Sequence, residues 1–173
     1  MKDKKILKIT MSALFAALIC VATMFIMVPL PGNGYANFGD CFILVGALML
    51  GPVYGAAAAG IGAALSDLFL GYAVYAPATF VIKALMAVVV YGVCHTLKKK
   101  GVSDVLSVLP AVIAAELLMI AGYFLFEIPL YGIDVALVDI IGNGVQGLVG
   151  AVSGFLVYNA LHKIGVAKKT LAL

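Results

Sequence analysis

The sequence predicts an all-α, polytopic membrane protein that crosses the bilayer six times and keeps both termini in the cytoplasm. Three observations support this fold class: the composition, the continuous apolar runs and the placement of the lysines. Of the 173 residues, 65% are hydrophobic and 11% are charged, whereas a soluble domain is about 45–50% apolar and about 25% charged. The apolar runs do not alternate with polar residues, so helices rather than barrel strands are expected. We expect one integral membrane domain over residues 1–173.

The apolar runs give the expected spans. They cover residues 7–28, 41–51, 53–72, 77–97, 104–126 and 140–162. The second run is short, because a helix of that length reaches only about 16 Å, roughly half of a hydrocarbon core. It could be merged with the third run to give five spans. Gly51-Pro52 is nevertheless a plausible place for a helix to break, since proline cannot continue the hydrogen-bonding pattern.

The lysines decide between five and six spans. They cluster at residues 2–8, 98–100 and 163–169, with Lys83 standing apart. Basic clusters beside apolar spans mark the cytoplasmic side, so an even number of crossings must separate the first two clusters. A break at Gly51-Pro52 gives four crossings there, and two more return the last cluster to the cytoplasm. The lysines adjoin span ends, which disfavours a nucleic-acid-binding surface.

A cleaved signal peptide is the alternative interpretation of residues 1–28. Its apolar core would be longer than the usual 7–15 residues, and its removal would spoil the even count of crossings. With six spans, residues 31–40, 71–78 and 127–139 face the outside. Turn-forming and polar residues are concentrated in these segments.

Two ionisable residues lie at matching depth in neighbouring spans. Asp67 is near the outer end of the third span and Lys83 near the outer start of the fourth, and a charge within a membrane costs about 2.5–3.5 kcal/mol on insertion scales. We predict a structural ion pair between Asp67 and Lys83. A contact between Lys83 and a ligand is the alternative, and the two roles are compatible.

Polar side chains also gather in the outer halves of the last two spans. Asp139, Asn143 and Gln146 follow one another at helical spacing, and Glu116 and Tyr123 share a face of the preceding span. A single amide in a membrane helix usually joins helices, but amides, acids and tyrosines together favour a pocket for a small heteroaromatic ligand. The candidate substrate-binding residues are Asn33, Asn37, Tyr75, Lys83, Glu116, Tyr123, Asn143 and Gln146.

Signals for other chemistry are weak. The cysteines Cys20, Cys41 and Cys94 are scattered, so we predict no metal site. The sequence has no GxxxxGK[ST] loop for ATP phosphates and no HExxH motif, and the serine in "GAVSG" (150–154) lacks the spacing of a nucleophile elbow. An intramembrane enzyme is therefore a weak alternative.

Three features resemble the substrate-binding S components of energy-coupling factor (ECF) vitamin transporters, specifically the riboflavin-type group. They are "NFGDCFILVGALMLGPVYGAAAAGIGAALSDLFLGYAVYAPATFVIKALMA" (37–87), the stripe of Ala13 and Ala17, and "NGVQG" in the last span. The resemblance covers nearly the whole chain. It implies a six-helix protein of the prokaryotic cell membrane that binds a vitamin from outside, with residues 31–40 as a lid.

The resemblance also implies partners. Ala13 and Ala17 would dock onto a transmembrane coupling (T) subunit, which two cytoplasmic ATPases serve, so ATP is used by the partners and no cofactor is expected in this chain. The chain has no tryptophan or arginine, which argues against indole stacking or a guanidinium clamp on an anion. A pyridoxine- or hydroxymethylpyrimidine-like ligand is favoured, ahead of riboflavin and pantothenate. A structural or regulatory membrane subunit without a ligand is the alternative.

Overall fold

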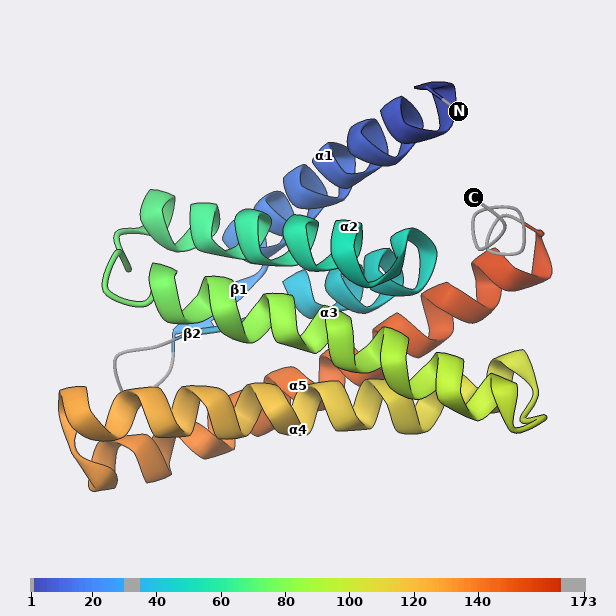
Figure 1. Cartoon of the computed structure of the whole chain (residues 1–173). Coiled ribbons are helices and arrows are strands. Elements are labelled where there is room, and N and C mark those ends of the chain that lie inside the picture. The colour runs from blue at the N-terminus through green and yellow to red at the C-terminus, as the bar shows by residue number, and fades with distance from the viewer. Residues whose placement is uncertain (1, 30–34, 166–173) are drawn as a thin grey trace.

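The computed structural model describes residues 2–29 and 35–165, and it is helical apart from one short hairpin (Figure 1). In chain order the elements are α1 (Lys2–Phe25), β1 (Met27–Pro29), β2 (Tyr35–Asn37), α2 (Gly39–Leu70), α3 (Ala76–Lys99), α4 (Asp104–Tyr131) and α5 (Ile133–Lys163). In the described part of the chain, all five helices are long and apolar enough to cross a membrane. The predicted all-α membrane architecture is confirmed at this level.

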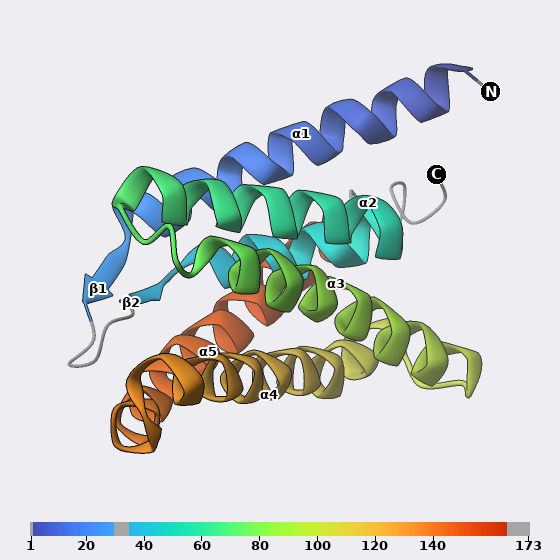
Figure 2. The same cartoon turned by 60° about the vertical axis from the view of Figure 1, so that its left-hand side comes forward.

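Helix α2 reverses its direction at Gly51. This residue has φ 81° and ψ 177°, a backbone conformation that favours glycine, and Pro52 follows it without an N–H to donate. A Cβ atom on Gly55 would lie 2.7 Å from the Cα of Ala47, so the two halves of α2 run side by side, as Figures 1 and 2 both show. The predicted break at Gly51-Pro52 is present.

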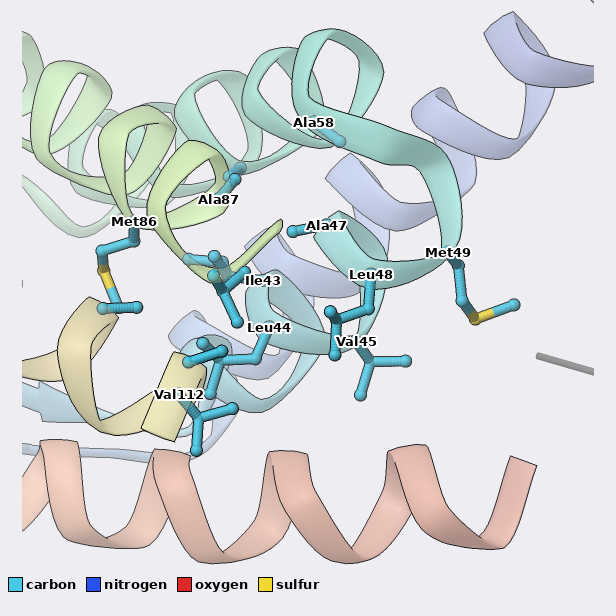
Figure 3. Packing of buried hydrophobic residues seen from close by; sticks show 14 of the residues in the cluster. Ile43, Leu44, Val45, Ala47, Leu48, Met49, Ala58, Met86, Ala87 and Val112 are labelled. Carbon is cyan, nitrogen blue, oxygen red and sulfur yellow. The ribbon is translucent and has the colours of Figure 1, made fainter. Parts of the chain in front are cut away.

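The first half of α2 runs through the interior of the bundle. Every residue from 43 to 50 is buried, and Figure 3 shows Leu44, Val45 and Leu48 in the hydrophobic cluster with Met86 of α3 and Val112 of α4. This explains why the second apolar run is short and uniformly apolar. A helix that other helices surround on every side is apolar all round.

The segment after α1 forms a hairpin. Strands β1 and β2 pair antiparallel, with Met27 opposite Asn37 and Pro29 opposite Tyr35. The N–H of Phe38 donates to the carbonyl oxygen of Ile26 at 3.1 Å, which closes the base of the hairpin. The predicted lid segment 31–40 therefore contains strand β2 and the first turn of α2.

The prediction that residues 127–139 form a loop between two spans was wrong. Helix α4 continues to Tyr131 and α5 begins at Ile133, so Gly132 alone joins them, with φ 85°. Pro129 lies in the last turn of α4. It has no N–H, so one helical hydrogen bond is absent, and the helix ends two residues later. Pro129 and Gly132 do mark a change of chain direction, but the connection between the helices is one residue and not a loop.

The lysine-rich segments lie at one end of the bundle, and the hairpin lies at the other. The start of α1, the connection from α3 to α4 and the end of α5 share that end (Figure 1). There Asp104 accepts from Lys98 Nζ and lies against His162 Nε2, both at 3.1 Å. These contacts tie α3, α4 and α5 together, which places two of the basic clusters beside each other.

Candidate functional site

A small polar cavity lies beneath the hairpin, at the end of the bundle opposite the lysines. Its volume is about 30 Å³, which holds about one or two water molecules. Strand β2 and all five helices contribute to its wall. The lining residues are Thr23, Tyr35, Asn37, Ala63, Ser66, Asp67, Thr79, Lys83, Tyr123, Asn143 and Gln146.

A buried ion pair stands beside this cavity. Lys83 Nζ lies 2.5 Å from Asp40 Oδ1, and the two side chains are 2% and 0% exposed. The predicted pair between Lys83 and Asp67 was therefore wrong in its partner. The reversal at Gly51 brings the first turn of α2, with Asp40, to the same depth as Lys83, and Asp40 is the acid that Lys83 meets.

Gln146 connects this ion pair to the hairpin. Its Nε2 donates to Asp40 Oδ2 at 2.5 Å, and its Oε1 accepts from the backbone N–H and the Nδ2 of Asn37 at 3.0 and 3.2 Å. Asn37 Oδ1 in turn accepts from the backbone N–H of Gly39 at 2.9 Å. The amide on α5 thus holds strand β2 against the helices.

A second contact also holds the hairpin down. The hydroxyl of Tyr35 donates to Asp67 Oδ1 at 2.5 Å. Burial, and then the nearby Asp67 carboxylate, raise the pKa of Tyr35, so its hydroxyl remains a donor. Asp67 is 2% exposed, and its Oδ2 has no hydrogen-bond partner among the described residues.

The rest of the wall combines hydroxyl groups with an aromatic face. The hydroxyls of Thr79 and Tyr123 are 3.0 Å apart, and Lys83 Nζ lies 5.5 Å from the centre of the Tyr123 ring. Asn143, which is 5% exposed, completes the wall from α5.

Several predicted binding residues do not line the cavity. Tyr75 belongs to a neighbouring aromatic cluster: it stacks on Tyr131 and donates to Glu127 Oε1 at 3.4 Å, and burial and the Glu127 carboxylate raise its pKa. Glu116 lies against Gly147 and Gly150 of α5, is 4% exposed, and has no hydrogen-bond partner among the described residues for either oxygen. Asn33 lies outside the described residues.

Five predicted residues do line the cavity: Asn37, Lys83, Tyr123, Asn143 and Gln146. Sequence reasoning missed Thr23, Ser66 and Thr79, because isolated hydroxyl residues in a membrane helix carry no specific signal. It assigned Asp67 to an ion pair and placed Asp40 in the lid. The grouping of Asp67 with Ser66 near the outer end of the third span was the available signal.

An apolar groove on the outside of the bundle contains the predicted docking residues. It lies between α1 and the second half of α2 and has a volume of about 670 Å³. Ala13 and Ala17 line it and are exposed. Opposite them the groove is lined by Ala57, Ala58, Ile61 and Leu65.

One family model matches nearly the whole chain. The family described as "ECF-type riboflavin transporter, S component" matches residues 3–163. A protein of Pyrococcus woesei, described as "Uncharacterized protein in gap 3'region", is 33% identical over 137 residues, which are 79% of this chain and 88% of that protein.

The solved structure of the S component of a bacterial ECF transporter shares the fold. Its TM-score is 0.72 at 24% identity, over 95% of this chain and 98% of that chain. The predicted resemblance is confirmed by the family match. S components are transport subunits and not enzymes. The chain belongs to the ECF-type riboflavin transporter S component family.

Proposed function

We propose that this chain captures a small heteroaromatic vitamin from outside the cell and delivers it to an ECF coupling module. That module consists of a transmembrane T subunit and two cytoplasmic ATPases. The observation that carries the proposal is the small polar cavity beneath a hairpin that two side-chain contacts hold in place. Burying polar and charged side chains in a membrane helix bundle costs free energy. A role in binding a polar ligand is a reason for the protein to keep them there.

The proposal includes an orientation in the cell membrane. We place both termini in the cytoplasm and count six crossings, with each half of α2 as one of them. The reversal at Gly51 supports this count, because the second half of α2 runs back toward the end of the bundle from which the first half started. The lysines gathered at one end support the cytoplasmic assignment of that end through the positive-inside rule.

The ligand that we favour is a pyridoxine- or hydroxymethylpyrimidine-like compound. A drug-sized ligand pocket usually measures about 300–1,000 Å³, so the cavity of about 30 Å³ must widen, and a single small ring requires the least widening. Amide, hydroxyl and carboxylate groups on the wall suit a ring that carries hydroxyls and nitrogen. Pantothenate has a carboxylate and no ring, and the one buried lysine near the cavity is already paired with Asp40.

Riboflavin is the second candidate, because the family description names it. Its three-ring system requires a larger displacement of β2 from the helices. The rings of Tyr35 and Tyr123 would provide apolar faces for either ligand.

The hairpin is the proposed lid. Opening it breaks the hydrogen bonds from Asn37 to Gln146 and from Tyr35 to Asp67. Both contacts join β2 to a helix that lines the cavity, so ligand entry and hairpin movement are coupled.

Titration of the purified chain tests the proposal. Pyridoxine, hydroxymethylpyrimidine and riboflavin are titrated by calorimetry, and co-purified compounds are identified by mass spectrometry. We expect one of them to bind saturably with a sub-micromolar Kd, and Asn143→Ala to weaken binding by about tenfold. Asn159→Ala is the matched control, because Asn159 lies on the same helix toward the lysine-rich end.

The outcomes separate the alternatives. Absence of binding by every compound favours a structural or regulatory subunit. Equal weakening by Asn143→Ala and Asn159→Ala would show that the cavity is not the binding site.

A further inference from the structure

Buried acids greatly outnumber buried bases in this protein. The described part of the chain buries five carboxyl side chains but only one lysine, Lys83. The buried acids are Asp40, Asp67, Glu116, Glu127 and Asp139. A buried charge needs a partner or a proton, and the lysine can satisfy only part of this set.

The lysine is already bound. Lys83 Nζ lies 2.5 Å from Asp40 Oδ1, and Gln146 supplies a donor to the other oxygen of Asp40. Each carboxylate oxygen of Asp40 therefore has a partner, the Lys83 ammonium for Oδ1 and the Gln146 amide for Oδ2. Lys83 lines the same cavity as Asp67, but its Nζ makes its ion pair with Asp40.

Asp67 is the acid that faces the cavity without a cation. It is 2% exposed, it lines the cavity, and its Oδ2 has no hydrogen-bond partner among the described residues. Its Oδ1 accepts from the hydroxyl of Tyr35. The cavity wall thus carries one buried acceptor oxygen that is available to a donor from inside the cavity.

Apart from Lys83, which is paired with Asp40, the side-chain donors around Asp67 are neutral hydroxyls. Ser66 donates to the carbonyl oxygen of Ala63 at 2.6 Å, and the hydroxyls of Thr79 and Tyr123 bond to each other at 3.0 Å. None of these groups brings a positive charge. A cation in direct contact with Asp67 must therefore come from the ligand, because Lys83 is held by Asp40.

We propose that Asp67 is a specificity-determining residue that binds a protonated amine of the ligand. The inference rests on the proposed function and narrows its ligand class to small basic heteroaromatic compounds. The rings of Tyr35 and Tyr123 on the same wall suit such a ligand, because the face of an aromatic ring attracts a cation. A neutral flavin ring would leave the Asp67 carboxylate without a cation.

A matched pair of ligands tests this inference. Pyridoxamine carries an amine where pyridoxine carries a hydroxyl, and an alkyl amine is protonated at neutral pH. We expect the wild-type chain to bind pyridoxamine at least about tenfold more tightly by calorimetry. Asp67→Asn should abolish this preference, because the amide cannot form an ion pair with the amine. Asp104→Asn, the same change at the opposite end of the bundle, should retain the preference.

Each outcome decides the question. Equal binding of the two compounds by the wild-type chain, or an unchanged preference in Asp67→Asn, overturns the inference and leaves the proposed function standing. If neither compound binds while riboflavin does, the vitamin-binding function holds and the charged-ligand inference fails; if nothing binds, both fail. Should Asp67→Asn not fold, the wild-type preference decides, and Tyr35→Phe, which keeps the carboxylate, should preserve it.

Discussion

Replacing Lys83 by methionine should destabilise the protein strongly. The change keeps most of the side-chain volume but removes the ammonium that lies 2.5 Å from Asp40, a residue that is fully buried. Breaking a buried ion pair by removing one partner costs about 3–5 kcal/mol, because the remaining charge is left without compensation. For a chain of 173 residues, each kcal/mol lowers Tm by about 2–4 °C. The expected decrease is about 6–20 °C.

The double variant Lys83→Met with Asp40→Asn should recover most of this loss. It removes both charges, and the amide oxygen at position 40 can still accept from Gln146 Nε2. Replacing a buried pair by neutral groups of similar volume is often nearly neutral. We therefore expect the double variant to lie within about 1–2 kcal/mol of wild type, so the two single costs should not add in a double-mutant cycle.

The buried cysteines provide the assay. Cys20, Cys41 and Cys94 are all free and buried, so a fluorogenic thiol reagent reports unfolding when they become exposed. Melting curves of the wild type, the two single variants and the double variant are recorded in one detergent at one scan rate. A double variant no more stable than Lys83→Met would show that the two charges do not compensate each other, and the reasoning on the polar network would fail.

Three further predictions concern the lid, the packing and the docking groove. Tyr35→Phe removes the hydrogen bond from the hairpin to α2, so the ligand should dissociate about tenfold faster in stopped-flow measurements; an unchanged rate would separate this contact from the lid. Gly62→Ala places a Cβ atom 2.5 Å from a backbone oxygen of α1, so Tm should fall by several degrees, whereas Gly92→Ala, where a Cβ meets nothing within 4 Å, should leave Tm unchanged. Ala13→Trp fills the exposed groove, so it should block vitamin uptake by the assembled transporter but spare ligand binding by the isolated chain; loss of both would argue against docking there.

The features that the sequence predicted well have local signals. Gly51-Pro52 combines a residue that tolerates positive φ with one that cannot donate, and the chain reverses there. Asn143 and Gln146 are spaced by three residues, so they share a helix face whatever the neighbours are, and both line the cavity. The composition alone was sufficient for the membrane class.

The features that it missed depend on contacts between distant segments. Depth along a span can be counted from the sequence, and this count placed Asp67 and Lys83 at the same level. It does not say which way each side chain faces around the bundle, and Lys83 meets Asp40, which lies 43 positions earlier. The corner at Gly132 was missed for a different reason, since Pro129 and Gly132 predict a turn but not its length.

The second half of α2 lines both the cavity and the apolar groove between α1 and α2. One of its faces contributes Ala63 and Asp67 to the cavity, and another contributes Ile61 and Leu65 to the groove. Between them Gly62 packs directly on the backbone of α1, with no side chain that could absorb a displacement. If a partner that binds in this groove displaces the second half of α2, it also displaces the wall that carries Asp67. In that case coupling between the two sites is reciprocal, and a ligand that shifts this wall changes the affinity of the groove for that partner by the same factor.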